Sequence, residues 1–182
     1  MKTFWFIVGS QFLYGEETLR QVEENAKTIA KGLKTKYPVV YKGTVKTYDE
    51  AMRLIKSANY EEECLGVITF CHTFSPSKMW ANALKALQKP WCHFHTQFYD
   101  EIPNEEIDMD YMNLHQSAHG DREHGFIGTR LQKKRKVIVG HWQDPKTSVA
   151  ISNWQDVVAA VNESKSLRVI RFGDNMREVA VT

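Results

Sequence analysis

The sequence predicts an α/β fold: an open, doubly wound, mostly parallel sheet with helices on both faces, as in a flavodoxin-like three-layer sandwich. Three observations support this prediction. Segments with strand and helix patterns alternate along the whole chain, which is typical of successive βαβ units. Residues 65–70 (LGVITF) are apolar without alternation, as in a strand buried on both faces. Polar stretches follow the predicted strands, where sheets of this kind bind their ligands.

The first half of the chain contains two further predicted strands, each followed by a helix. Residues 4–8 are β-branched or aromatic and predict the first strand. From about Glu16, apolar residues recur at helical spacing, at Leu19, Val22, Ala26, Ile29, Ala30 and Leu33. Residues 39–41 predict the second strand. Thr47, followed three residues later by Glu50, forms a capping-box pattern that predicts the start of the next helix.

The middle of the chain continues the alternation after residues 65–70. Ser75 followed by Pro76 predicts that a helix begins there, with the serine as its cap. The apolar face of this helix contains Trp80, Ala83, Leu84 and Leu87. Residues 91–94 predict the fourth strand, and the acidic segment 102–110 predicts a loop.

The last third contains two more helices and two more strands. Residues 109–131 predict a helix that is broken near Gly120 and Gly125, and residues 137–139 predict the fifth strand. A second capping-box pattern at 152–155 predicts the start of the last helix, and residues 167–172 predict a sixth strand.

The composition predicts one ordinary globular domain over residues 1–182, because no repeat, low-complexity tract or linker interrupts the pattern. The net charge of +2 is too small to indicate a nucleic-acid or anionic-membrane partner. No apolar run approaches the roughly 18 residues that span a bilayer, and the N-terminus lacks a signal-peptide cleavage pattern. Cys64, Cys71 and Cys92 have no metal-binding spacing, which favours reduced thiols in a cytoplasmic protein.

Four of the seven histidines lie at predicted strand ends: His72, His93, His95 and His141. They either form a functional site or serve as structural hydrogen-bonding groups, and the sequence leaves both interpretations open. His93 and His95 share one strand face and could be metal ligands. No carboxylate stands obviously beside them, which favours buried, hydrogen-bonded histidines. Nucleotide-binding and nucleophile-elbow motifs are absent.

His115 and His119 are four residues apart, so one helical face could hold both. Gln116 stands where the zinc-protease motif requires glutamate, and a surface or interface position is therefore favoured over a metal site. The basic run at 130–136 is interpreted as a solvated helix end, and nucleic-acid binding is the less favoured alternative.

Several motifs, in order along the chain, resemble the N-terminal part of bacterial L-arabinose isomerases. They are 5–11 (WFIVGSQ) with 13–15 (LYG), 72–80 (HTFSPSKMW), 94–98 (FHTQF), 107–114 (IDMDYMNL) with 116–120 (QSAHG), 139–144 (VGHWQD) and 171–182 (RFGDNMREVAVT). The resemblance covers essentially the whole chain. It implies the N-terminal domain of an aldose–ketose isomerase that interconverts L-arabinose and L-ribulose.

The resemblance also implies which residues bind the sugar. Those in the subunit's own pocket are Gln11, Leu13, Tyr14, Phe74 and Met176. Gln116 and His119 would reach into the pocket of a neighbouring subunit, because the family forms trimers and hexamers. The chain departs from the family at Phe12, which replaces a histidine, and at His115, which replaces an asparagine. Either change can alter the polarity of the cleft.

The resemblance places the catalytic glutamates and the divalent metal, usually manganese, in domains beyond Thr182. No catalytic or metal-binding residue is therefore expected in this chain, which should be inactive alone. Two other hypotheses stay open. The chain could be a free-standing sugar-binding or assembly module without catalysis. It could also be a complete small isomerase with a new metal site at His72, His93 or His95.

Overall fold

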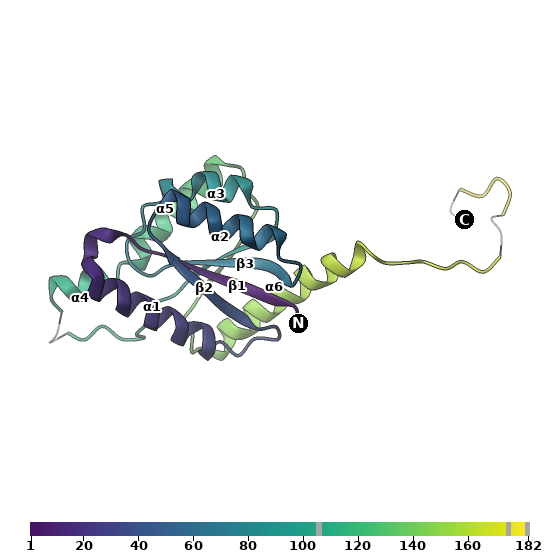
Figure 1. Ribbon diagram of the computed structural model, residues 1–182. Coiled ribbons are helices and arrows are strands. Elements are labelled where there is room, and N and C mark those ends of the chain that lie inside the picture. Colours follow the sequence, from purple (N-terminus) through teal and green to yellow (C-terminus); the bar gives the residue numbers. More distant parts are fainter. Residues whose placement is uncertain (105–106, 174–175, 181–182) are drawn as a thin grey trace.

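The computed structural model describes residues 1–104, 107–173 and 176–180. Its centre is a sheet of five strands in the order β2-β1-β3-β4-β5 (Figure 1). The strands are β1 (Thr3–Gly9), β2 (Val39–Val45), β3 (Cys64–Cys71), β4 (Trp91–His95) and β5 (Lys136–Val139). Each neighbouring pair is parallel, which confirms the predicted open, doubly wound α/β fold.

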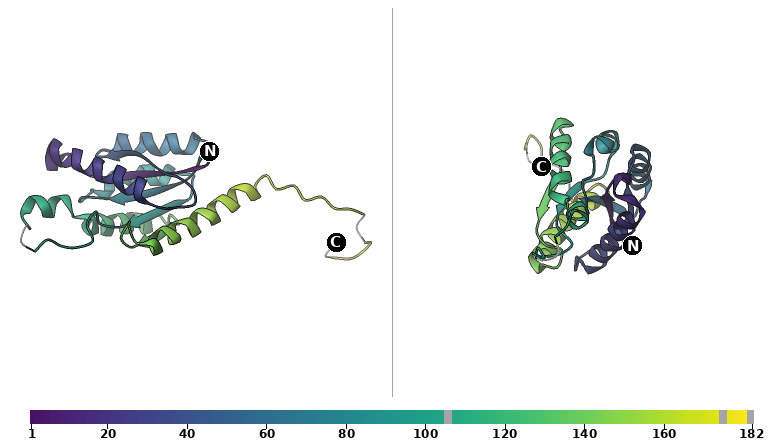
Figure 2. Two further views of the ribbon diagram at one scale, coloured as in Figure 1. Left: turned by 90° about the horizontal axis from the view of Figure 1, so that it is seen from below. Right: turned by 90° about the vertical axis from the view of Figure 1, so that its left-hand side faces the viewer.

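Helices cover both faces of this sheet (Figure 2). The helical elements are η1 (Phe12–Tyr14), α1 (Gly15–Gly32), α2 (Tyr48–Tyr60), η2 (Ser77–Trp80), α3 (Ala81–Ala86), α4 (Met109–Leu114), α5 (Ser117–Arg130) and α6 (Pro145–Ser164). Helices α1 and α6 pack on one face, and α2, α3 and α5 pack on the other. None of the helices in the described ranges is long and apolar enough to cross a bilayer.

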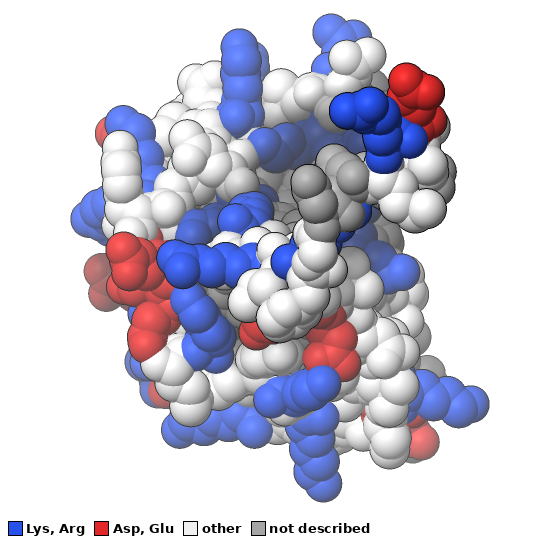
Figure 3. All heavy atoms as spheres, turned by 90° about the vertical axis from the view of Figure 1, so that its right-hand side faces the viewer, with Lys and Arg blue, Asp and Glu red and all other residues white. Residues whose placement is uncertain are grey.

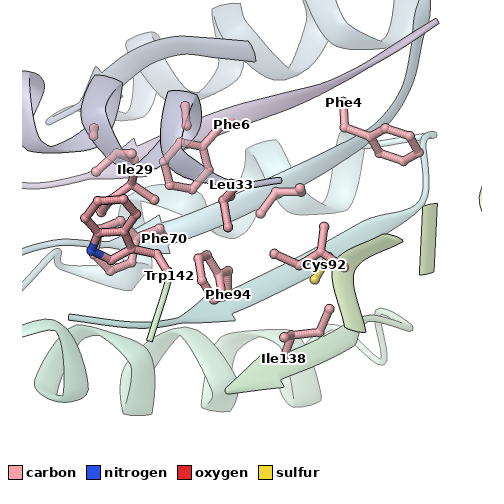
Figure 4. Close-up of a cluster of buried hydrophobic side chains, with 14 of the residues drawn as sticks. Phe4, Phe6, Ile29, Leu33, Phe70, Cys92, Phe94, Ile138 and Trp142 are labelled. Carbon is pink, nitrogen blue, oxygen red and sulfur yellow. The ribbon is translucent and has the colours of Figure 1, made fainter. Parts of the chain in front are cut away.

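Alternate side chains of β1 enter two separate cores, as the period of a strand requires. Phe6 packs with Ile29 of α1 and Ile151 of α6 in the first core (Figure 4). Ile7 packs with Ile55 of α2 in the second core. All eight residues of β3 are buried, which confirms the prediction of a strand covered on both faces.

The predicted cap at Thr47 is confirmed, with one difference in detail. Its hydroxyl accepts a hydrogen bond from the backbone N–H of Glu50 at 3.2 Å, which satisfies one N–H of the first turn of α2. The Glu50 carboxylate accepts from the N–H of Lys46 at 2.7 Å, one residue before the cap. Both groups therefore fix the start of α2.

The prediction that Ser75 caps a helix is wrong. The helical turn η2 begins two residues later, with Pro76 as its N-cap. The Ser75 hydroxyl accepts a hydrogen bond from the indole N–H of Trp80 at 3.2 Å. A buried tryptophan N–H needs an acceptor, and the Ser75 hydroxyl provides it here instead of capping a helix.

The predicted helix break near Gly120 and Gly125 is also wrong. The break falls at His115 and Gln116, between α4 and α5, and α5 passes through both glycines. A Cβ at position 120 would lie 2.9 Å from the Cβ of Cys71. This glycine therefore lets α5 approach the sheet closely and does not interrupt the helix.

The capping-box pattern at 152–155 lies inside α6 and starts no helix. The N-cap of α6 is Asp144, whose carboxylate accepts from the backbone N–H of Lys146 at 2.8 Å. The hydroxyl of Ser152 donates to the carbonyl of Ser148 at 2.8 Å, a bond within the helix. The proline that follows Asp144 is well placed at the first helical position.

Residues 167–172 form no strand, although a sixth strand is predicted there. The segment after α6 runs away from the sheet (Figure 1). Val169 and Phe172 are 85% and 94% exposed. In the described part of the chain, no neighbouring strand pairs with this segment, and β propensity alone does not order a strand.

Candidate functional site

The carboxyl ends of β1 and β3 lie side by side at the centre of the sheet. From there the chain leaves in opposite directions, to α1 on one face and to α3 on the other. The buried hydroxyls of Ser10 and Thr73 are 2.8 Å apart and join the two loops. Open α/β sheets bind ligands at this point, where the strand order reverses.

The turn after β1 presents three of the predicted sugar-binding residues. Leu13 is 82% exposed, and Gln11 and Tyr14 are half-buried. Within the described ranges, the side-chain amide of Gln11 has no hydrogen-bond partner. It therefore does not brace the turn, and it can donate to and accept from a ligand. Gly15, with φ of 79°, lets the chain enter α1 from this turn.

The structure brings together only some of the other predicted residues. The ring of Phe74 stacks on His119 with centroids 4.3 Å apart. Gln116 donates from its side chain to the side-chain oxygen of Asn113 at 3.0 Å. Met176 is 65% exposed and belongs to the part of the chain that follows α6.

The close approach of α5 to the loop after β3 predicts a large effect at Gly120. Gly120→Ala should destabilise the fold by about 1–3 kcal/mol, as overpacking does elsewhere. The new Cβ would lie 2.9 Å from the Cβ of Cys71 and 3.1 Å from the backbone N of Ser75. Urea denaturation measures the loss. Gly125→Ala is the matched control, because its nearest neighbour, in Arg135, is 3.7 Å away. Equal losses in both variants would contradict the prediction.

His72 is buried at the end of β3 and links three elements. Its Nδ1 lies 3.0 Å from the carbonyl of Leu114, and its Nε2 lies 3.0 Å from the side-chain nitrogen of Asn25 on α1. Burial lowers the pKa of His72 to about 4. The histidine is therefore neutral at pH 7 and has a structural role here.

A carboxylate does lie beside His93 and His95, contrary to the sequence-based expectation. Asp121 of α5 places Oδ1 2.8 Å from Nε2 of His93 and Oδ2 3.4 Å from Nδ1 of His95. Burial raises the pKa of Asp121 to about 7. This residue was missed because it reaches β4 from a helix 26 to 28 positions further along the chain.

A hollow of about 390 Å³ opens at the carboxyl ends of β4 and β5. His95, Asp121, Gly140 and His141 are among the residues that line it. His72 belongs to the opposite sheet face, where it packs against Phe70. The strand-end histidines therefore divide between the two faces and do not form one cluster.

His115 and His119 do not share one helical face. His115 follows the end of α4, where its ring packs on Tyr111 and Tyr99 at 4.4 and 5.2 Å between centroids. His119 belongs to α5. The Nε2 atom of His115 is buried and has no hydrogen-bond partner in the described part of the chain. The two histidines therefore form no paired metal site.

The basic run at 130–136 makes contacts that support its interpretation as a helix-end segment. The Lys133 ammonium donates to the carbonyl of Leu87, which follows the last turn of α3. The Arg135 guanidinium donates to the carbonyl of Gly125 at 3.1 Å and lies over the ring of Trp91. On the face shown in Figure 3, Lys and Arg lie in separate groups among uncharged and acidic residues.

Comparison with known proteins shows the family to which the chain is related. The family model described as the L-arabinose isomerase N-terminal domain matches residues 1–166. The chain is 56% identical to the L-arabinose isomerase of Pectobacterium atrosepticum, over 98% of this chain and 36% of that protein. It is 54% identical to the enzymes of Geobacillus stearothermophilus and Flavobacterium johnsoniae, over 98% and 100% of this chain. It spans 37% of each of those two proteins, so the match covers about a third of each relative's length. The chain therefore belongs to the L-arabinose isomerase N-terminal domain family.

Proposed function

We propose that this chain forms part of an enzyme that interconverts L-arabinose and L-ribulose in the cytoplasm. Its role is to supply one wall of the sugar pocket and part of a subunit interface. The main support for this proposal is that the chain belongs to the L-arabinose isomerase N-terminal domain family. The structure adds a second argument, because the unpaired amide of Gln11 stands where sheets of this type bind ligands.

The residues around the turn after β1 suit a pentose. The Gln11 amide offers both a donor and an acceptor to a sugar hydroxyl. Leu13 and Tyr14 offer apolar surface for the carbon skeleton of the sugar. Phe74 stacks on His119 and holds that imidazole at the start of α5. We propose that His119, which is exposed, and Gln116 contact the pocket of a neighbouring subunit in a trimer or hexamer.

Manganese does not fit the donors of this chain. In the described ranges, one group of at least three His, Cys, Asp or Glu side chains lies within mutual reach: Cys71, His93 and Asp121. It contains a buried thiol and a single carboxylate, whereas manganese prefers several oxygen ligands. We therefore propose that a manganese ion, which polarises the sugar oxygens when bound, is held by residues outside this chain.

A fusion experiment tests the proposal. The 182-residue chain is assayed for L-ribulose formation from L-arabinose with Mn²⁺. The same assay is run on a fusion in which this chain replaces the matching part of the Geobacillus stearothermophilus enzyme. We expect no ketose above a buffer blank from the chain and clear turnover from the fusion. A folded, assembled fusion without turnover would refute the proposal.

A free-standing sugar-binding module is the second candidate function, and the same unpaired Gln11 amide favours it. Calorimetric titration of the 182-residue chain with L-arabinose separates the two. Millimolar or tighter binding by the chain, together with an inactive fusion, would support a binding module. Absence of heat at high protein concentration would remove it.

Substitution of Gln11 tests the assignment of the sugar pocket. In the fusion enzyme, Gln11→Ala should lower kcat/KM roughly threefold to a hundredfold, because one or two neutral hydrogen bonds are lost. The melting temperature should change little, since this side chain bonds nothing else in the described residues. Gln88→Ala, at an exposed position before β4, is the matched control and should leave both values unchanged. Lost stability with unchanged kinetics would show that Gln11 has only a structural role.

A further inference from the structure

A buried cluster between the sheet and α5 brings three metal-ligating side chains together, and a fourth lies at its edge. The Sγ of Cys71, a ring nitrogen of His93 and a carboxylate oxygen of Asp121 lie within 4.8 Å of one another. All three residues are buried. The fourth side chain is His95, whose Nδ1 lies 3.4 Å from the Asp121 carboxylate. This cluster lies on the sheet face opposite His72 and does not include the turn after β1.

The fold explains why these side chains converge. Thr69 pairs with His93 in the sheet, so Cys71 and His95, two residues further along each strand, point to the same face. Helix α5 lies on that face and directs Asp121 at both histidines. Gly120 has no side chain to hold the helix away from Cys71. Three rigid elements therefore define the positions of the ligand atoms.

Neighbouring groups orient His93 as they do in known metal sites. Its Nδ1 lies 2.8 Å from the hydroxyl of Thr69, which also accepts from the indole N–H of Trp91 at 2.8 Å. With Nδ1 held in this way, Nε2 points at Asp121 and away from the sheet. A metal-ligating histidine commonly has its second ring nitrogen fixed by such a hydrogen bond.

His95 connects the cluster to solvent. Its side chain is 29% exposed, whereas that of Asp121 is 5% exposed. Both residues line the hollow of about 390 Å³ at the ends of β4 and β5. A hydrated ion can therefore enter from this hollow and reach the buried donors past His95.

We propose that Cys71, His93, His95 and Asp121 bind a divalent metal ion of the zinc class. One sulfur, two imidazole nitrogens and one carboxylate oxygen are the donors that tetrahedral Zn²⁺ accepts, and Co²⁺ is its spectroscopic substitute. Binding breaks the hydrogen bond between His93 and Asp121 and forms bonds from each to the metal. The proton of that hydrogen bond moves to Nδ1 of His93, which then donates to Thr69, or leaves to solvent. The Cys71 thiol loses its proton to solvent on binding, since the thiolate is the ligand.

Cobalt absorption identifies the ligand set. The 182-residue chain is freed of metal with a chelator and titrated with Co²⁺, and bound zinc is then counted after dialysis. We expect one zinc per chain, a thiolate-to-cobalt charge-transfer band and the visible bands of tetrahedral cobalt. Cys71→Ser should abolish the charge-transfer band. Cys92→Ser should keep it, because Cys92 is an equally buried thiol on the opposite face of the sheet.

Two further variants keep the test decisive if Cys71→Ser does not fold. Thr69→Val should weaken zinc binding by about 10- to 100-fold, because it removes the hydroxyl that orients His93. The same change removes the acceptor of the Trp91 indole N–H, so a melting curve of this variant confirms that it is folded. His95→Gln changes a partly exposed side chain and should also weaken binding. A well-folded wild-type chain with neither bound zinc nor a thiolate–cobalt band would overturn the proposal. A charge-transfer band that survives in Cys71→Ser and disappears in Cys92→Ser would do the same.

Discussion

Lowering the pH from 7 to 5 should destabilise the fold by about 2 kcal/mol through His72 alone. The folded pKa of about 4 lies below the ordinary value of 6.5, so the unfolded chain binds this proton more readily. The contribution of His72 is therefore fully favourable above pH 6.5. It decreases as the pH falls through the interval between the two pKa values, and below pH 4 it no longer changes.

Burial is the main cause of this low pKa. The hydrogen bond to the carbonyl of Leu114 raises the pKa in part, and the neighbouring His115 lowers it further. The side-chain oxygen of Asn25 accepts from Gln21 at 2.8 Å, so its nitrogen is the atom that faces His72. That nitrogen donates to Nε2, which must therefore carry a lone pair. Nδ1–H donates to the carbonyl of Leu114. Protonation of Nε2 would place two donors opposite each other in a buried position.

Urea denaturation at pH 7, 6 and 5 measures the effect. His72→Gln keeps one donor and one acceptor but does not titrate. Between pH 7 and pH 5, its free energy of unfolding should therefore fall by about 2 kcal/mol less than that of the wild type. His119→Gln, which removes an exposed histidine, is measured alongside as the control. His93 and His124, whose pKa values burial also lowers, titrate in every variant. An unchanged slope in His72→Gln would show that another group causes the acid sensitivity.

Trp80→Ala should cost about 3–5 kcal/mol of folding free energy, as removal of a buried aromatic ring does elsewhere. The Trp80 side chain is fully buried between the sheet and the helices of the second core. Its ring meets His124 edge-on at 5.3 Å between centroids, and its N–H donates to Ser75. The loss is a large part of the roughly 5–15 kcal/mol that stabilises an ordinary domain.

The comparison of two tryptophans makes this prediction specific. Trp80→Phe retains a ring and loses the hydrogen bond to Ser75, so its cost should be smaller than that of Trp80→Ala. Trp154→Ala removes a ring that is only partly buried, at the edge of the first core, and should also cost less. Denaturation curves for the three variants give the order. A loss below about 1 kcal/mol in Trp80→Ala would mean that the ring is not packed as described.

Most of the fold could be predicted because its signals are local. The apolar stripe of α1 and the unbroken apolar run of β3 are visible in the residues of each segment alone, and both correctly indicate which residues are buried. The errors arose where two local patterns competed or where a pattern had no partner. Asp144 with its following proline starts α6, although Ser152 offers a second capping pattern inside the helix. Residues 167–172 have strand-forming side chains, and no strand among the described residues pairs with them.

The sites divide in the same way. The turn that holds Gln11 could be placed from topology, because the strand order determines where an open sheet presents its loops. Asp121 could not be placed, because its meeting with His93 depends on how α5 packs on β4. The spacing of residues along the chain does not predict such a contact between a helix and a distant strand. The buried Nε2 of His115, which has no hydrogen-bond partner among the described residues, could not be predicted either, since a single helix was expected over 109–131.

The parallel pairing of β1 with β3 has a consequence for the order of folding. Thr3 pairs with Cys64, and Ser10 bonds Thr73 across 63 positions, whereas β3 and β4 pair across 24. Closing a longer loop costs more chain entropy before any contact offsets it. We expect the β3–α3–β4 unit to be structured first and the β1–β3 pair to close later. The turn that carries Gln11 would then become ordered late, so slow refolding should delay sugar binding more than the recovery of helical signal.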